Sequence, residues 1–95
     1  MLTSKQRAAL KAMANSIEPI IYVGKGGLTD NVITQVDEAL TARELIKGTV
    51  QQNAPESAAE VLQTIAEATG AEPVSSSGRK FVLYRARPKD PTIKI

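Results

Sequence analysis

The sequence contains no cysteine and no histidine, and the two absences exclude several classes of chemistry. Without cysteine the chain can form neither a disulfide nor a thiolate metal site. Without histidine it lacks the commonest general base and the commonest metal ligand, so Ser–His and Cys–His nucleophile pairs are excluded. Carboxylate and lysine chemistry remain open in principle. We therefore expect a non-enzymatic protein with no catalytic residue, no metal and no cofactor.

Long hydrophobic runs are also missing. No segment approaches the ~20 apolar residues that a membrane-spanning helix needs, and the N-terminal residues lack the apolar core of a signal peptide. A cytoplasmic location without a membrane partner fits these absences best. The 95 residues, 42% of them hydrophobic, match the size of one packed domain, which we expect to span 1–95.

Charges of the two signs are concentrated in different parts of the chain. Residues 1–11 hold three cations and no acid, 12–78 hold three cations and nine acids, and 79–95 hold six cations and one acid. Basic ends around an acidic middle suggest a face that binds a polyanion, although solvated basic termini would give the same pattern. Because 86–95 contains Pro88 and Pro91, we expect it to form an extended, partly ordered basic tail.

Three segments carry apolar residues at helical spacing. The first helix is expected to run from a Ser4 cap to about residue 15, and the second from Thr29 to about residue 43. The third is expected to begin near Pro55 and to end at Gly70. The predicted apolar faces are Ala9, Leu10, Met13 and Ile17; Val32, Ile33, Val36, Ala39 and Leu40; and Ala58, Val61, Leu62, Ile65, Ala68 and Thr69.

Four segments are expected to be strands: 20–23, 45–51, 72–76 and 79–85. The first has no polar interruption, which is typical of a strand covered on both faces. Gly48 marks a bulge or a close approach by another element. A turn at Ser77-Gly78 makes the last two strands a hairpin, and two strand–helix–strand connections imply parallel pairing. We therefore predict a compact α/β domain, α-β-α-β-α-β-β, on a four-stranded mixed sheet.

The glycine cluster Gly24-Lys25-Gly26-Gly27 separates the first expected strand from the second helix. Glycines let a backbone approach a ligand closely and take positive φ, and a helix N-terminus adds unpaired N–H groups and partial positive charge. With Lys25 at its tip and Thr29 opening the helix, this loop is predicted to hold a phosphate.

The spacing of the cluster fits neither the Walker pattern nor the Rossmann fingerprint. A tight strand-to-helix turn without a ligand is the alternative. A Gly-x-x-Gly loop clamps the nucleic-acid backbone in KH domains, but there it joins two helices, whereas here it follows a strand.

Features along almost the whole chain resemble the YhbY-type RNA-binding proteins, which consist of one CRM (chloroplast RNA splicing and ribosome maturation) domain. The matching features are Lys5-Gln6-Arg7 and Leu10, Pro19-Ile20-Ile21, Val23 to Thr29, Val32, Ala39-Leu40, Glu44 to Lys47, Thr69-Gly70, Gly78 and Val82 to Arg85. Gly48 departs from the family, whose members usually carry an apolar residue there.

The resemblance implies a fold similar to the C-terminal domain of translation initiation factor three. It also implies RNA binding through the loop Gly24–Gly27, and association with precursors of the large ribosomal subunit and their RNA. From the residues themselves we expect flanking basic groups to extend this surface. The RNA-binding candidates are Gly24, Lys25, Gly26, Gly27, Thr29, Lys5, Lys11, Arg79, Lys80, Arg85 and Arg87.

Aromatic residues are few, so recognition by backbone and shape is favoured over base stacking. Tyr22 and Tyr84 are expected in the core or the sheet, and Lys47 either reaches the RNA or is a solvated strand residue. Two other functions remain as alternatives. In the first, a protein-interaction module, the basic ends dock an acidic ribosomal or assembly protein and RNA contact is incidental. A phosphate-handling enzyme is disfavoured because the chain lacks histidine, cysteine and a carboxylate cluster near the loop.

Overall fold

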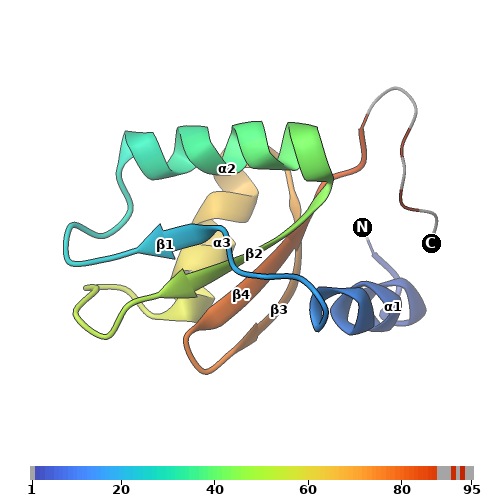
Figure 1. Ribbon diagram of the computed structural model, residues 1–95, viewed down its shortest axis with the longest axis horizontal. Helices are drawn as coiled ribbons and strands as arrows, with labels where there is room; N and C mark the ends of the chain where they lie inside the picture. Colours follow the sequence, from blue (N-terminus) through green and yellow to red (C-terminus); the bar gives the residue numbers. More distant parts are fainter. Residues whose placement is uncertain (1, 88–90, 92, 94–95) are drawn as a thin grey trace.

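The structure, a computed structural model, describes residues 2–87, 91 and 93. Its elements are α1 (Ser4–Ala14), β1 (Ile21–Val23), α2 (Asp30–Arg43), β2 (Leu45–Val50), α3 (Ala58–Thr69), β3 (Glu72–Ser77) and β4 (Lys80–Tyr84) (Figure 1). This is the order predicted from the sequence, and the four strands form one mixed sheet. Within the described residues no helix has the length and apolar character needed to cross a bilayer.

The strand order β1-β2-β4-β3 differs in one respect from the expected pairing. β1 and β2 are parallel, as predicted, but β3 pairs only with β4, which lies between β2 and β3 and is antiparallel to both. The reason is burial. β4 has four buried residues and takes a central position, whereas the serine-rich β3, which contains Pro73, lies at the edge, where a missing N–H is tolerated.

Each face of the sheet has its own core. The core under α2 and α3 includes Val36, Leu40, Val61, Ile65, Ile46, Val50, Phe81 and Leu83. The core under α1 includes Leu10, Ala14, Leu45, Val74, Val82 and Tyr84. Figure 1 shows α2 and α1 on opposite sides of the sheet. The sheet is therefore covered unequally, by two helices on one face and a single short helix on the other.

The cap and the buried face of α1 differ from the prediction. Thr3 caps the helix instead of Ser4: Thr3 Oγ1 accepts the Gln6 N–H at 3.1 Å, and Gln6 Oε1 accepts the Thr3 N–H at 2.9 Å. This reciprocal pair satisfies two helix-end donors, which Ser4 at the next position does not do. The helix packs through Leu10 and Ala14, four residues apart. The apolar positions that are exposed instead are Ala9 and Met13.

The start of α3 also differs from the prediction. The helix begins at Ala58 with Ser57 as its cap, again in a capping box, so Pro55 precedes the helix and lies in the loop. Gly70 is the C-cap, as expected, with φ +71°. The buried face contains Ala66 in place of Ala68.

The first strand lies at the edge of the sheet. One of its two faces is open, contrary to the expectation that both are covered. β1 spans only three residues, and its middle residue, Tyr22, is 57% exposed. α1 packs against β2, β3 and β4 and leaves this part of the sheet open. The apolar run 20–23 could not predict the open face, because the sequence alone does not distinguish an exposed aromatic residue from a buried one.

Gly48 marks a close approach, one of its two predicted explanations. It pairs with the fully buried Phe81 of β4, and a Cβ at position 48 would overlap three atoms of the Phe81 ring. The β2–β4 register is continuous, so no bulge occurs there. The irregularity of the sheet lies in β3, between Pro73 and Ser75.

A fully buried acid, Glu44, joins α2 to β2 with φ +67°. Its carboxylate accepts the N–H groups of Arg87 at 3.2 Å and Ile93 at 3.3 Å. These two residues of the predicted tail are thus anchored to the domain, whereas 88–90, 92 and 94–95 lie outside the described residues. Burial, followed by the charge of Glu44, raises the pKa of Tyr84 above its ordinary value.

Candidate nucleic-acid interface

One end of the sheet gathers three connecting segments. Because β1 and β2 are parallel, the glycine loop and the β2–α3 loop both leave the sheet at this end, and the β3–β4 turn lies there too (Figure 1). The Val50 N–H donates to Arg79 O at 2.7 Å, which ties the turn to the end of β2. The structure therefore places the glycine loop, Arg79 and Lys80 at the same end of the domain.

The glycines of the loop have different roles. The Gly27 N–H donates to Gly24 O at 2.9 Å and closes a turn, and Gly27 has φ +68°, which favours glycine. A Cβ at Gly24 would lie 2.7 Å from Gln51 Oε1. At Gly26, by contrast, a Cβ would meet nothing within 4 Å. The positive φ thus accounts for Gly27, whereas the contact at Gly24 is with the flexible end of the exposed Gln51 side chain, and Gly26 has no packing role among the described residues.

A carboxylate that the sequence analysis did not include lies against this loop. Glu56 Oε2 accepts the Leu28 N–H at 3.3 Å, and Glu56 Oε1 is buried and has no hydrogen-bond partner among the described residues. One of the N–H groups predicted to face a phosphate is therefore used by the protein itself. No sequence signal joins Glu56 to the loop, because the two are 28 residues apart and meet only through the parallel pairing of β1 and β2.

The tip of the loop keeps free donors. Within the described part of the chain, the N–H groups of Lys25 and Gly26 form no hydrogen bond, and both residues are exposed. Thr29 caps α2 as predicted, with its Oγ1 accepting the Val32 N–H at 3.3 Å. The accessible anion-binding groups are thus the Lys25 ammonium and two adjacent backbone N–H groups at the tip.

Two of the predicted cations meet in a cleft. Lys11 of α1 and Lys80 of β4 line a cleft of about 240 Å³ between α1 and the sheet, and Lys47 of β2 lines it with them. Lys5 is exposed on α1 but does not line this cleft. The sequence did not decide whether Lys47 reaches the RNA or is a solvated strand residue. Its nearness to Lys80 follows only from the register of β2 and β4.

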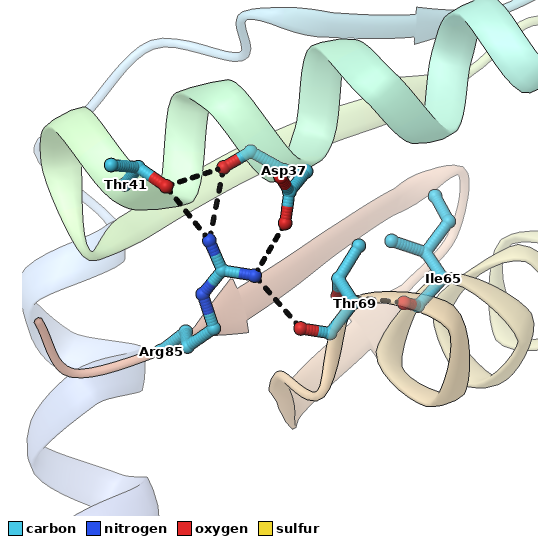
Figure 2. Close-up of polar contacts among 5 residues, drawn as sticks. All are labelled: Asp37, Thr41, Ile65, Thr69 and Arg85. Carbon is cyan, nitrogen blue, oxygen red and sulfur yellow. Dashed lines mark hydrogen bonds and ion pairs between the residues drawn. The ribbon is translucent and has the colours of Figure 1, made fainter. Parts of the chain in front are cut away.

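Arg85, another predicted RNA contact, is engaged within the domain (Figure 2). Its Nη1 donates to Asp37 Oδ1 at 2.7 Å and to Thr69 O at 2.8 Å, and its Nη2 donates to Asp37 O at 3.0 Å and Thr41 Oγ1 at 2.9 Å. The guanidinium therefore bridges α2 and the C-terminal end of α3 from the end of β4. That is the end of β4 opposite to Lys80.

Arg87 is engaged in the same region. Its Nε donates to Thr41 O at 3.2 Å, and its Nη2 donates to Ala42 O, so the side chain binds carbonyls of the last turn of α2. A cation suits this position because the C-terminal end of a helix carries partial negative charge. The structure thus separates Arg85 and Arg87 from the glycine loop, which the charge pattern had grouped with them.

A cavity larger than the lysine-lined cleft contains none of the predicted RNA contacts. It has a volume of about 550 Å³ and is lined mainly by apolar residues. The lining residues are Met13, Ser16, Ile17, Glu18, Ile20, Arg43, Leu45, Ile46 and Ile93. Size alone would select this cavity, but exposed donors, and cations that form no ion pair with the described residues, select the loop and the lysine-lined cleft instead.

Gly27→Ala is expected to destabilise the domain by about 2 kcal/mol, because a side chain in the left-handed region costs about 1–2 kcal/mol. In addition, the new Cβ would lie 2.7 Å from Glu56 Oε1 and 2.9 Å from Pro55 Cγ. Gly26→Ala is the matched control and should leave stability nearly unchanged, since its Cβ meets open space. Urea unfolding of both variants measures the difference, and equal stabilities would contradict the assigned loop geometry.

The α-β-α-β-α-β-β order on a four-stranded mixed sheet is the fold that the CRM resemblance implied. The chain belongs to the CRS1/YhbY (CRM) domain family, whose model matches residues 2–85.

Relatives that the chain matches over most of their length support this membership. The chain is 40% identical over 95 residues to "Probable RNA-binding protein YqeI" of Bacillus subtilis, covering all of this chain and 99% of the relative. An "RNA-binding protein" of Haemophilus influenzae is 34% identical over 84 residues, which cover 88% of this chain and 85% of that protein. The solution structure of the hypothetical protein SAV1595 of Staphylococcus aureus, 41% identical, superposes with a TM-score of 0.84 over 100% of this chain and 99% of that one.

Proposed function

We propose that this protein is a non-catalytic RNA-binding protein that associates with precursor large-subunit ribosomal RNA during ribosome assembly in the cytoplasm. The observation that carries the proposal is membership of the CRM family together with relatives named as RNA-binding proteins. The loop tip supplies a physical basis, because an ammonium and two free backbone N–H groups suit a phosphate and read no base.

In this proposal an RNA phosphate approaches the protein backbone most closely at Gly26. Nothing in the described part of the fold requires a glycine there, yet within it the Gly26 N–H forms no hydrogen bond and a Cβ would meet open space. A backbone without a side chain lets a phosphate reach the N–H groups at 25 and 26. Gly24, Gly27 and Thr29 then shape the loop, and Arg79 and Lys80 extend the positive surface at the same end of the sheet.

The remaining predicted contacts take different places in the proposal. Arg85 and Arg87 support the fold at the far end of the sheet, and Lys5 contributes only to the general positive field of α1. Glu56 limits where a phosphate can bind on the loop, because its carboxylate repels an anion close to Leu28. The phosphate is therefore placed at the tip of the loop, on the Lys25 side.

Lys25→Gln is expected to weaken binding to large-subunit ribosomal RNA fragments about tenfold, since one charge-assisted contact contributes about 1.5 kcal/mol. The slope of log K against log salt should fall by about 0.7–0.9, the value for one phosphate. Filter binding at four salt concentrations measures both. Arg43→Gln, which removes an exposed cation of α2 outside the interface, is the control and should change neither quantity.

Lys25→Arg should retain most of the affinity, because it keeps the charge at the tip. If wild-type protein binds the RNA but Lys25→Gln binds equally well at every salt concentration, the loop is not the contact. If wild-type protein fails to bind protein-free RNA and sediments with immature subunits, docking to an acidic ribosomal or assembly protein replaces the proposal.

A further inference from the structure

The face of the sheet under α1 contains a basic cleft that is separate from the glycine loop. Its cations are Lys11, Lys47 and Lys80, and its other polar residues are Asn15, Ser75 and Ser77. Among the residues that the structure describes, no carboxylate lines it. Among residues 2–87, 91 and 93, none forms an ion pair with Lys11 or Lys80. Three like charges around one small cleft repel one another, so an anion between them is favourable.

Lys47 is held in place before any ligand arrives. It is half-buried, and its Nζ donates to Ala14 O at 3.2 Å, at the C-terminal end of α1. The partial negative charge of the helix end stabilises the ammonium there. Fixing this long side chain in the folded protein removes part of the entropy cost of ordering it on binding.

The cleft also offers hydroxyl donors. Ser75 and Ser77 of β3 lie on the same face as Lys80, since Ser77 pairs with Lys80 and Ser75 pairs with Val82. Neither serine side chain forms a hydrogen bond in the described part of the protein. Ammonium and hydroxyl donors converging without an acceptor of negative charge match a phosphate, whose oxygens are acceptors only.

The cleft lies within reach of the loop. Tyr22, Thr49 and Lys80 are register partners on neighbouring strands, so they form one row across the sheet. Two strand spacings, about 10 Å, separate the first from the last. Tyr22 is two residues before Gly24 in the chain, so the row runs from the start of the glycine loop to the cleft, and none of its members is acidic.

We propose that the cleft lined by Lys11, Lys47 and Lys80 binds a second phosphate of the RNA strand that the glycine loop holds. This inference rests on the proposed function. It adds a particular site, which sets the path of the strand across the open part of the sheet and over Tyr22. The three lysines then act on one phosphate together, instead of as separate solvated cations.

The test is the double variant Lys11→Gln/Lys80→Gln, measured with the same RNA fragments and salt series. Both side chains are exposed and lack ion pairs within the described chain, so thermal melting should be close to wild type. Affinity is expected to fall about tenfold and the salt slope by about 0.7–0.9, as for one lost phosphate. The amide resonances of Ser75 and Ser77 should shift when RNA is added to wild-type protein and not when it is added to the double variant.

The controls separate this inference from the proposed function. Lys11→Arg/Lys80→Arg should retain binding, and Arg43→Gln should be neutral. If Lys25→Gln weakens binding but the double variant does not, the second site is wrong while the function stands. If wild-type protein does not bind RNA at any salt concentration, both fail. If the double variant reduced the slope of log K against log salt by twice the expected value, the inference would also be overturned. Lys11 and Lys80 would then each neutralise a separate phosphate.

Discussion

Gly48→Ala should unfold far more easily than the wild type, with a loss of about 3 kcal/mol. Added methyl groups in a packed core usually cost about 1–3 kcal/mol. The upper end applies here because the new Cβ would overlap the ring of Phe81, which is completely buried. For a domain of this size the loss corresponds to a melting temperature lower by about 12–24 °C. Urea unfolding and thermal melting measure the two quantities.

The cause can be tested by making room for the methyl group. Phe81→Leu alone should destabilise the protein by leaving a cavity. Combined with Gly48→Ala, it should cost clearly less than the two changes added together, because the Cβ occupies part of the space of the ring. Strictly additive losses would show that the contact with Phe81 is not the reason for Gly48.

Arg85→Gln is expected to lower stability by about 2 kcal/mol without changing RNA affinity of the folded protein. The ion pair with Asp37 contributes little of this, because Asp37 is 56% exposed. Most of the loss should come from the bridge to Thr69 O and Asp37 O, which joins three elements (Figure 2). Charge-assisted hydrogen bonds contribute about 1.5–3 kcal/mol when formed. Urea unfolding measures the change.

The variant Arg85→Lys separates the contribution of the planar guanidinium group from that of its positive charge. An ammonium keeps the positive charge but does not reproduce the planar fork, so at least half of the stability loss should remain. Asp37→Asn, which removes only the ion pair, should cost less than 1 kcal/mol. A fully stable Arg85→Lys variant, or one whose RNA affinity falls at a temperature where it is folded, would contradict the structural role.

Local sequence patterns were sufficient to predict which elements form. The 32–40 stripe of α2, the cap at Thr29 and the αL glycine at 70 were all correct, because each depends on residues within one or two turns. The central place of β4 was not predictable in this way. It depends on which strand has two buried faces once all helices are packed, and that is a property of the whole sheet.

The same distinction applies to the candidate site. Glycine spacing located the loop, but it did not reveal Glu56 beneath it. Charge counts treated Arg85 and Lys80 alike, although one is used inside the fold and the other remains available. Sequence shows that a cation is present, and only tertiary contacts show whether its hydrogen-bonding groups are already occupied.

The contacts of Glu44 help to define the C-terminal boundary of the domain. The family match ends at residue 85, yet the buried carboxylate at 44 receives hydrogen bonds from the backbones of 87 and 93. If the chain were cut at residue 85, this buried carboxylate would lose two of its hydrogen-bond donors, which would destabilise the fold. An excised version of the domain, or a fusion to another protein, should therefore be designed to retain the residues through 93.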